Sequence, residues 1–196
     1  MSQLELPMPI SGLPLDLKAL SAEIHHANIV AGWWVKDEET GRTRNRNTAE
    51  LLALIHSEIS EADVGFERGL MDDKLPHRRM TEVELADVAI RVLDMLGFYE
   101  HSCVVPGRTL ALPEYSYWPD WCRLLHRTTT QALEAFRKGR TDDGCVYLVD
   151  VLGVVHFCAI QFRYDLTGAI TEKRAFNASR ADHKPENRAK VGGKAF

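Results

Sequence analysis

The sequence predicts an all-α fold, a bundle of about five to six helices. Three observations predict it: apolar residues recur at a period near 3.6, helix-capping residues precede several of these stretches, and proline and glycine gather between them. Hydrophobic residues make up 45% of the chain and charged residues 27%, as in ordinary globular proteins. Because no change in composition marks a second unit, we expect one domain over residues 1–196.

Three helices are expected in the first half of the chain, after an extended lead-in. Residues 1–14 should be extended because they contain three prolines and a glycine. Apolar residues at a helical period predict the first helix over about 16–34. The second is expected over 47–69 and the third over 81–102, since each begins with a capping-box match, NTAE and TEVE respectively.

The second half is expected to add two long helices and a shorter one. Prolines and a glycine predict an irregular segment over 103–119. Helices should then cover about 120–138, 144–164 and 166–178, before a polar tail over 179–196. The stretch VYLVDVLGVVHF is rich in β-branched residues, as strands are. Its length without a turn nevertheless predicts a buried helix.

Charge and cysteine content argue against several classes of protein. A formal net charge of -4 and a pI of about 6.1 give no reason to expect a nucleic acid or an anionic membrane as partner. The four cysteines lack the spacing of a zinc site and suit a reducing cytoplasm. The amino terminus lacks a basic, apolar leader, and no stretch reaches the roughly 18 to 20 apolar residues of a membrane span. We expect a cytoplasmic protein.

Two pairs of carboxylates lie on neighbouring predicted helices. Glu58 and Glu61 are three residues apart, and so are Glu84 and Asp87, which places each pair on one helix face. Apolar residues around both pairs indicate that these faces border the core. Crowded carboxylates repel one another unless a cation compensates them, and oxygen ligands of this type suit Mg²⁺ or Mn²⁺. The two pairs therefore predict a divalent-metal site.

Each pair by itself has another explanation. An isolated Glu-x-x-Glu also occurs on solvated helix faces, and Glu84 occupies the glutamate position of a predicted capping box. Iron is disfavoured because di-iron bundles use Glu-x-x-His pairs, and neither acidic pair includes a histidine. The second pair on the next helix, across a basic loop, favours the metal interpretation.

The arrangement of the four acids resembles that of a known family. The string EISE from Glu58 to Glu61, a spacer of 22 residues and the string ELAD from Glu84 to Asp87 are similar to the ExxE…ExxD signature of MazG-like all-α nucleoside triphosphate pyrophosphatases. The strings GLMDDKLPHRRMTEVELADVAIRVLD and EKRAFNASRADHKPENR resemble the phage-encoded branch of that family. The resemblance covers about residues 25–100 and 165–196. Helical periodicity alone guides the prediction between them.

The resemblance implies a reaction and its metal ligands. Glu58, Glu61, Glu84 and Asp87 would hold the divalent ions, and the substrate would be hydrolysed between its α- and β-phosphates to a monophosphate and pyrophosphate. Either Glu58 or Glu61 would orient or deprotonate the attacking water. We expect a dNTP or NTP as substrate, with dGTP or GTP leading, and a role in adjusting a nucleotide pool.

A second motif implies contacts to phosphate. Lys173, Asn177 and Arg180 match the family pattern K-x-x-x-N-x-x-R, at spacings that place them on one helix face. The lysine and arginine would bind phosphate oxygens. Lys74 and Arg78, in the loop between the acidic helices, would close over pyrophosphate or merely make the turn soluble. The C-terminal segment also fits a solvated helix end, where cations are favoured.

Base recognition is expected from the first helix and the loop after it. The family stacks the base on an aromatic or imidazole ring there, where this chain has His25, Trp33 and Trp34, with Asn28 for contacts to the base edge. Each ring could instead belong to the core or an interface. Adjacent tryptophans cannot share a helix face, so at most one would be core. Asp94 would support the metal site or form a salt bridge.

Three interpretations of the whole chain remain. The first is a metal-dependent nucleotide pyrophosphohydrolase that forms a dimer or tetramer, because one bundle of this size leaves the metal helices partly uncovered. The second is a helical nucleic-acid-binding or regulatory protein that uses its basic C-terminal segment on phosphates without metal. The third is a metal-binding interaction module without catalysis. Inward carboxylates would repel nucleic acid, which favours the enzyme.

Overall fold

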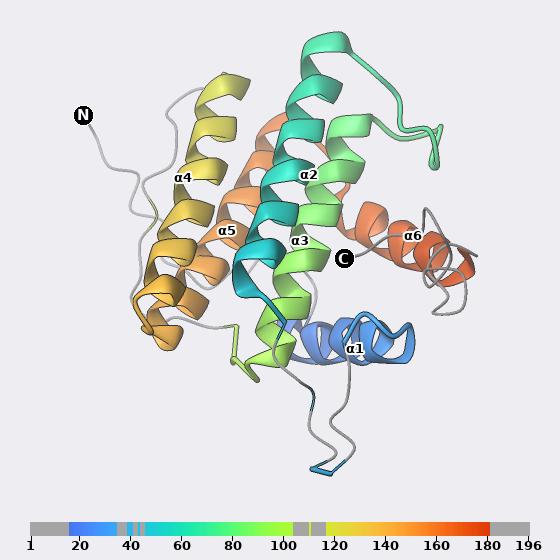
Figure 1. The fold of residues 1–196 in the computed structure, drawn as a ribbon. Helices are drawn as coiled ribbons and strands as arrows, with labels where there is room; N and C mark the ends of the chain where they lie inside the picture. Colours follow the sequence, from blue (N-terminus) through green and yellow to red (C-terminus); the bar gives the residue numbers. More distant parts are fainter. Residues whose placement is uncertain are drawn as a thin grey trace, which may run out of the picture.

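The computed structural model describes residues 16–34, 39–40, 43, 46–103, 110 and 117–180. The predicted lead-in, most of the predicted irregular segment and the tail beyond residue 180 lie outside these residues. Within the described ranges the fold is all-α, as predicted, with six helices and no β-strand (Figure 1). The helices are α1 (Leu17–Val30), α2 (Thr48–Arg68), α3 (Met80–Phe98), α4 (Trp118–Arg137), α5 (Thr141–Phe162) and α6 (Leu166–Ser179).

Helix α3 is the element that connects the two sides of the bundle. It contacts α1, α2, α5 and α6. Helices α2 to α5 run side by side, while α1 and α6 cross on the side of α3 away from α4 (Figure 1). The buried residues of α3 include Glu84 and Asp94 besides its apolar side chains. The acidic part of α3 is therefore surrounded by α1, α2 and α6.

The predicted start of α2 is confirmed. Asn47 is its N-cap, and the Asn47 side chain accepts a hydrogen bond from the backbone N–H of Ala49 at 3.0 Å. Glu50 completes the cap by accepting from the Asn47 side-chain amide at 3.1 Å. The helix ends at Gly69, whose φ of 62° is the left-handed conformation that glycine adopts without strain.

The capping box predicted at the start of α3 is wrong. The helix begins one residue earlier, with Arg79 at the N-cap and no side-chain cap. The Thr81 hydroxyl instead donates to the backbone carbonyl of Ala62 on α2 at 3.2 Å, because the two helices are close enough to compete for it. Glu84 is therefore not required for capping, and its carboxylate is available to the site described below.

Helices α1 and α3 approach each other most closely at Gly97. A Cβ atom at this position would lie 2.5 Å from Ser21 O and 2.7 Å from His25 Cβ, so a larger residue would displace α1. Helix α3 ends at Phe98, short of the predicted end at residue 102. The close approach fixes where α1 lies against α3.

Helix α5 is a buried core helix, as its sequence predicted. By length and composition it could cross a membrane, which corrects the expectation that no stretch is apolar enough. The most apolar window of α5 has a mean hydropathy of 1.9, and 67% of that window is buried in the bundle. A core helix of a folded bundle meets the same two criteria.

All four cysteines are buried free thiols. They are Cys103, Cys122, Cys145 and Cys158. Burial raises the pKa of each thiol, to about 11 for Cys122 and about 12 for Cys145. None therefore has the exposed, thiolate-forming environment of a reactive cysteine.

Candidate metal centre

Three of the four predicted metal ligands come together between α2 and α3. Glu58, Glu84 and Asp87 each offer one carboxylate oxygen, and these atoms all lie within 4.8 Å of one another. Glu84 and Asp87 share a face of α3 because they are three residues apart, and the contact between α2 and α3 brings Glu58 to them. Glu58 and Glu84 are only 7% and 6% exposed. We call these three residues the carboxylate group.

Glu61 lies next to the carboxylate group without belonging to it. It is one turn beyond Glu58 on α2, is exposed, and lines the same cavity as the three acids. Partial burial of its carboxyl, followed by the charge of Glu58, raises the pKa of Glu61. The structure thus distinguishes the two glutamates of α2, which the sequence left equivalent.

The carboxylate group is electrostatically unfavourable by itself. Burial, followed by the charge of Asp87, raises the pKa of Glu84 well above its usual range. Burial also raises the pKa of Asp87 to about 6, although the Lys173 ammonium acts in the opposite direction. Like charges at these distances disfavour joint ionisation. A bound cation would relieve this repulsion.

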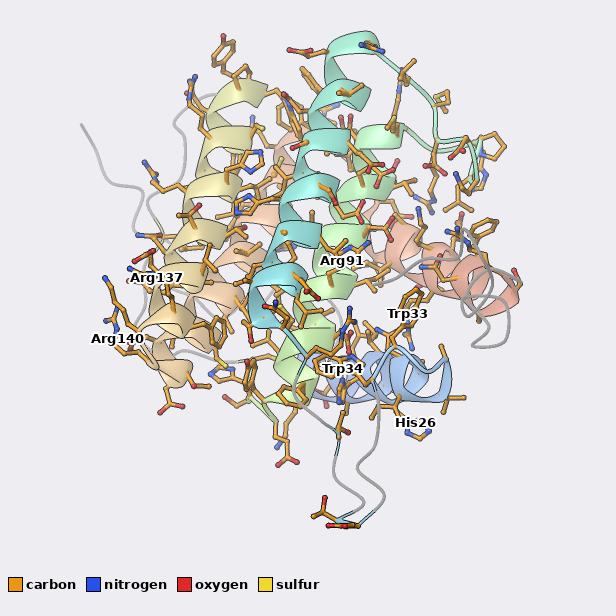
Figure 2. The ribbon with its side chains drawn as sticks, in the orientation of Figure 1. His26, Trp33, Trp34, Arg91, Arg137 and Arg140 are labelled. Carbon is orange, nitrogen blue, oxygen red and sulfur yellow. The ribbon has the colours of Figure 1, made fainter. Side chains whose placement is uncertain are left out.

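Two cationic side chains contact the carboxylate group. Lys173 Nζ on α6 lies 2.7 Å from Asp87 Oδ2. Arg91, one turn beyond Asp87 on α3, donates from Nε to Glu58 Oε1 at 2.7 Å. Burial by itself would lower the pKa of Lys173, but the charges of Asp87 and Glu84 outweigh it and raise this pKa. Figure 2 shows Arg91 beside α3, with the two adjacent tryptophans below it.

The acids and both cations line one open cavity. Its volume is about 870 Å³, within the range of small-molecule sites. Helices α2 and α3 supply the acids, and α6 supplies cationic and amide groups. Apolar side chains of α2 and α3 form a further part of the wall: Leu51, Leu54 and Ile90. The cavity therefore has a strongly charged part and a part suited to a flat apolar ring.

The residues of the second motif lie together on the α6 side of the cavity. Lys173, Asn177 and Arg180 all line it. Arg180 follows the end of α6 and has an extended backbone, so the prediction of one shared helix face is wrong for this residue. Asn177 Oδ1 is buried, and no hydrogen-bond partner for it exists among the described residues. The Arg180 guanidinium lies over the Phe176 ring, 5.7 Å from its centroid. A buried polar atom in this position ordinarily binds a ligand or a water.

The expected base-binding residues are divided between the cavity and the core. Asn28 and Trp33 line the cavity. Trp34 is 2% exposed and donates from Nε1 to both carboxylate oxygens of Asp94, at 3.0 and 2.9 Å. His25 Nδ1 lies 2.8 Å from Asp94 Oδ1. His25 and Trp34 thus serve to anchor α1 and the residues after it to α3, and Asp94 is the anchor.

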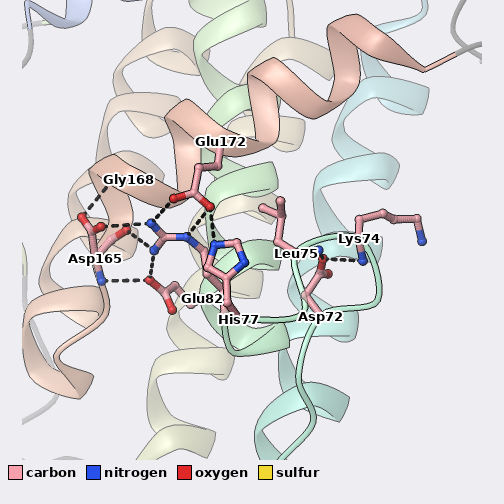
Figure 3. Close-up of polar contacts among 9 residues, drawn as sticks. Asp72, Lys74, Leu75, His77, Glu82, Asp165, Gly168 and Glu172 are labelled. Atoms are coloured by element: carbon pink, nitrogen blue, oxygen red, sulfur yellow. Dashed lines mark hydrogen bonds and ion pairs between the residues drawn. The ribbon is translucent and has the colours of Figure 1, made fainter.

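The two basic residues predicted to bind phosphate from the loop between α2 and α3 also differ in their surroundings. Lys74 lines the cavity, whereas Arg78 lies in a network of acids. Glu82, Asp165 and Glu172, the acids of this network, are labelled in Figure 3. Arg78 donates to Glu82 at 2.6 Å, to Asp165 at 3.1 Å and to Glu172 at 2.7 Å. Its side chain is 11% exposed. Arg78 therefore ties the loop to α6, which differs from the expected contact with pyrophosphate.

The arrangement of ligands argues for an oxygen-coordinated ion. Di-iron bundles take a Glu-x-x-His pair from each of two helices, and this sequence has one such pair, Glu23 and His26. Both residues are exposed on α1, and His26 lies at the outer edge of the bundle in Figure 2. The carboxylate group contains oxygen donors alone, as Mg²⁺ and Mn²⁺ prefer.

Comparison with protein-family models, curated proteins and solved structures found no match. Hard oxygen donors and cationic side chains line the same cavity, a combination that could hold a divalent cation together with a polyanion.

Arg91 is the main residue of the cavity that the sequence prediction missed. A signal was present, since Arg91 follows Asp87 by four residues and so shares its helix face. Its partner Glu58 lies on another helix, 33 positions away. That contact depends on how α2 and α3 are aligned, which periodicity does not determine.

Proposed function

We propose that the chain is a Mg²⁺- or Mn²⁺-dependent nucleoside triphosphate pyrophosphohydrolase of the MazG-like type, which cleaves a (d)NTP to a (d)NMP and pyrophosphate. One observation carries the proposal: three close carboxylates and two cationic side chains meet in one cavity. The carboxylates suit a hard divalent ion, and the cations suit the phosphates that such an ion accompanies. The ExxE…ExxD spacing supports the same function.

The carboxylate group fits a divalent cation. Its ligand atoms are all carboxylate oxygens, and the cationic side chains around them do not relieve their mutual repulsion fully. Glu58, Glu84 and Asp87 would hold the ion. When bound, Mg²⁺ or Mn²⁺ would neutralise phosphate oxygens and lower the pKa of the attacking water.

Glu61 is the best-placed residue to orient that water and accept its proton. It lines the cavity beside the carboxylate group and is exposed to the space that substrate would fill. The water attacks the α-phosphorus in line, the bond from this phosphorus to the bridging oxygen breaks, and pyrophosphate leaves with that oxygen. Glu58 remains with the ion.

The α6 residues would bind the phosphates. Lys173 and Arg180 provide positive charge for non-bridging oxygens, and Arg180 can contact two of them with its planar guanidinium. Asn177 would contact a phosphate or the sugar from the same face of the helix. Lys74, in the loop after α2, also lines the cavity and would approach the pyrophosphate end.

The apolar part of the cavity would take the nucleoside. Trp33 offers a ring for stacking and Asn28 offers a donor and an acceptor for a base edge. We propose purine nucleotides, with dGTP or GTP first, on the strength of the resemblance to the phage-encoded branch.

The proposal is tested by turnover of a panel of triphosphates. The protein is incubated with the four dNTPs and four NTPs, with Mg²⁺, Mn²⁺ or EDTA, and the products are separated by ion-pair chromatography. Monophosphate and pyrophosphate are expected in the samples with Mg²⁺ or Mn²⁺ and not in those with EDTA. Glu84→Gln and Glu61→Gln should each lower kcat by at least about 100-fold, since even residues behind a metal ligand cost 10- to 100-fold.

Glu134→Gln is a matched control. Glu134 is exposed on α4, where it pairs with Arg137, and its substitution should leave turnover unchanged. If the folded wild type binds metal and yet hydrolyses no triphosphate, the proposed function is wrong. Release of orthophosphate in place of pyrophosphate would also contradict it.

A further inference from the structure

Arg91 contacts a predicted metal ligand and also faces the cavity. It lies four residues after Asp87 on α3 and lines the cavity. Its Nε donates to Glu58 Oε1 at 2.7 Å, and a terminal guanidinium nitrogen contacts the same oxygen. The side chain of Arg91 is 36% exposed, whereas that of Glu58 is 9% exposed. The Glu58 end of the ion pair is therefore buried, and the Arg91 end is partly exposed to the cavity.

A divalent cation and Arg91 would compete for Glu58. A cation held by Glu58, Glu84 and Asp87 would bring two positive charges next to the guanidinium that already neutralises Glu58. Cations at such a separation repel each other, so the ion pair must weaken when the metal ion binds. A partly exposed ion pair is weak enough for this exchange.

The displaced guanidinium would remain beside the place that the phosphates occupy. Arg91 and Lys173 both contact the carboxylate group, from α3 and α6 respectively. The metal-bound triphosphate brings negative charge into the space between these helices. A guanidinium binds non-bridging phosphate oxygens through two parallel hydrogen bonds.

We propose that Arg91 changes partners when substrate binds. In the metal-free protein it neutralises Glu58, and in the complex with metal and triphosphate it binds non-bridging phosphate oxygens. This inference rests on the proposed function and assigns Arg91 a part in it. The exchange keeps the cavity close to charge balance in both states. The metal ion would replace Arg91 as the positive charge beside Glu58, and the phosphates would supply the negative charge beside Arg91.

The exchange predicts opposite effects of Arg91→Gln on two binding equilibria. Mn²⁺ alone should bind about fivefold more tightly, because Glu58 has lost its competing partner. A metal-bound triphosphate analogue should bind about tenfold more weakly, because it has lost a charge-assisted hydrogen bond. A residue that merely stabilised the fold would change both affinities in the same direction.

Isothermal titration calorimetry measures both equilibria without turnover. The wild type and each variant are titrated with MnCl₂ alone, and then with the α,β-imido analogues of dGTP and dATP in excess Mn²⁺. The variants are Arg91→Gln, Arg91→Lys and the control Arg137→Gln. Arg137 is an exposed arginine of α4 that is hydrogen-bonded to Glu134, far from Arg91 in Figure 2.

Arg91→Lys keeps the charge and loses the paired donors. It should bind Mn²⁺ as the wild type does and bind the analogues a few-fold more weakly. Arg137→Gln should change neither affinity. If Arg91→Gln fails to fold, Arg91→Lys decides, since unchanged analogue binding or weaker binding of Mn²⁺ alone would overturn the proposal.

The two proposals fail in different ways. A wild type that binds neither Mn²⁺ nor an analogue contradicts the proposed function and this inference with it. A wild type that binds both, with Arg91→Gln unchanged in both or shifted the same way in both, overturns the exchange and leaves the proposed function standing.

Discussion

Glu58, Glu84 and Asp87 are crowded at the cost of folding free energy. Replacing the Glu84 carboxyl with an amide of the same shape removes part of that repulsion. We expect Glu84→Gln to raise the free energy of unfolding of the metal-free protein by about 1–2 kcal/mol. Urea denaturation in EDTA at pH 7.5 measures this value, and a destabilised variant would contradict it.

Bound metal should make the wild type more stable than Glu84→Gln, the reverse of the order in EDTA. At Mn²⁺ concentrations about 100 times the dissociation constant, the wild type should gain about 2.7 kcal/mol, whereas Glu84→Gln should gain little because it has lost a ligand. The same denaturation series with Mn²⁺ in place of EDTA tests this, with Glu134→Gln as the matched control. Equal gains in both proteins would show that the ion binds elsewhere.

His56 and His126 form a second titratable pair, away from the metal site, between α2 and α4. Their Nδ1 atoms are 2.7 Å apart and their rings are stacked, so one ring donates and the other must be neutral to accept. Burial lowers the pKa of both histidines, and the charge of His126 lowers that of His56 further. The folded state therefore favours the neutral rings.

This pair should make the protein less stable in weak acid. A group whose pKa is lowered by folding contributes stability above its unfolded pKa, about 6.5 for histidine, and loses that contribution as the pH falls. The free energy of unfolding of the wild type should therefore fall more between pH 7.5 and 5.5 than that of His126→Gln. The acids of the metal site contribute equally to both proteins, so parallel curves would contradict the prediction.

Three of the four acids predicted from the sequence come together in the structure, and a spacing of three on a helix is a local property that the sequence shows directly. The sequence prediction assigned Arg78 and Trp34 to the substrate, but neither side chain lines the cavity. Arg78 contacts Glu172 on α6, and Trp34 contacts Asp94 on α3. Composition could not separate these roles, since a basic or aromatic residue suits either one. Each outcome depends on which other helix the side chain meets.

Helix α6 carries phosphate-binding candidates and is fixed to the loop before α3 by Arg78. Glu172, which accepts two hydrogen bonds from Arg78, directly precedes Lys173. Arg78→Gln should lower the free energy of unfolding by about 1–2 kcal/mol, less than for a fully buried pair because Glu172 and Asp165 are partly exposed.

The second effect of Arg78→Gln should be confined to α6. Amide hydrogen exchange over residues 166–179 should become faster in Arg78→Gln while exchange in α5 stays slow, and KM should rise more than kcat falls. Arg140→Gln serves as control, because Arg140 pairs with an exposed Asp143 at the start of α5. Uniformly faster exchange along the chain would contradict a local role.

The crossing of α1 and α3 depends on the absence of a side chain at Gly97. Gly97→Ala would place a methyl group against Ser21 O and His25 Cβ, so α1 must shift. We expect a loss of about 1–3 kcal/mol in unfolding free energy and weaker nucleotide binding, since α1 and the residues after it carry Asn28 and Trp33. Thermal unfolding and analogue titration measure the two effects.

Gly153→Ala tests whether the effect is specific to the crossing. Gly153 lies within α5, away from the cavity lining. A Gly97→Ala protein as stable as the wild type would show that α1 has room to adjust.

The helices themselves were largely predictable, since the helical period of the apolar residues and the capping residue Asn47 are signals that a few neighbouring residues carry. The start of α3 was predicted to within one residue, but its capping box was wrong, because Thr81 bonds to α2 in place of its own helix. The approach of α1 to α3 at Gly97 likewise depends on packing between the two helices. Local sequence does not encode such contacts between helices.

At the scale of the whole molecule, a homodimer or tetramer stays a prediction. Several large apolar side chains near the end of α2 and the loop after it are exposed: Val64, Phe66, Leu70 and Met71. Sedimentation equilibrium should give a mass of two or four times 22.1 kDa. A monomer at micromolar concentration would contradict the prediction. Leu70→Ser, at an exposed position outside the helices, would test whether this region takes part.

The all-α class followed from the sequence because every long apolar stretch shares one period. The relative placement of the six helices did not follow, since it depends on contacts between residues far apart in the chain. The cavity, too, depends on the relative placement of the helices and did not follow from the sequence. It exists because α1 and α6 cross on the same side of α3.

The four buried thiols make the bundle a reporter of its own opening. A thiol reagent reaches Cys158, within α5, when the core separates. Cys103 lies against α1, with its sulfur 3.8 Å from Ser21 Oγ, so it becomes accessible when α1 alone detaches. The order in which the two thiols are modified therefore separates fluctuations of α1 from unfolding of the core, without any label being introduced.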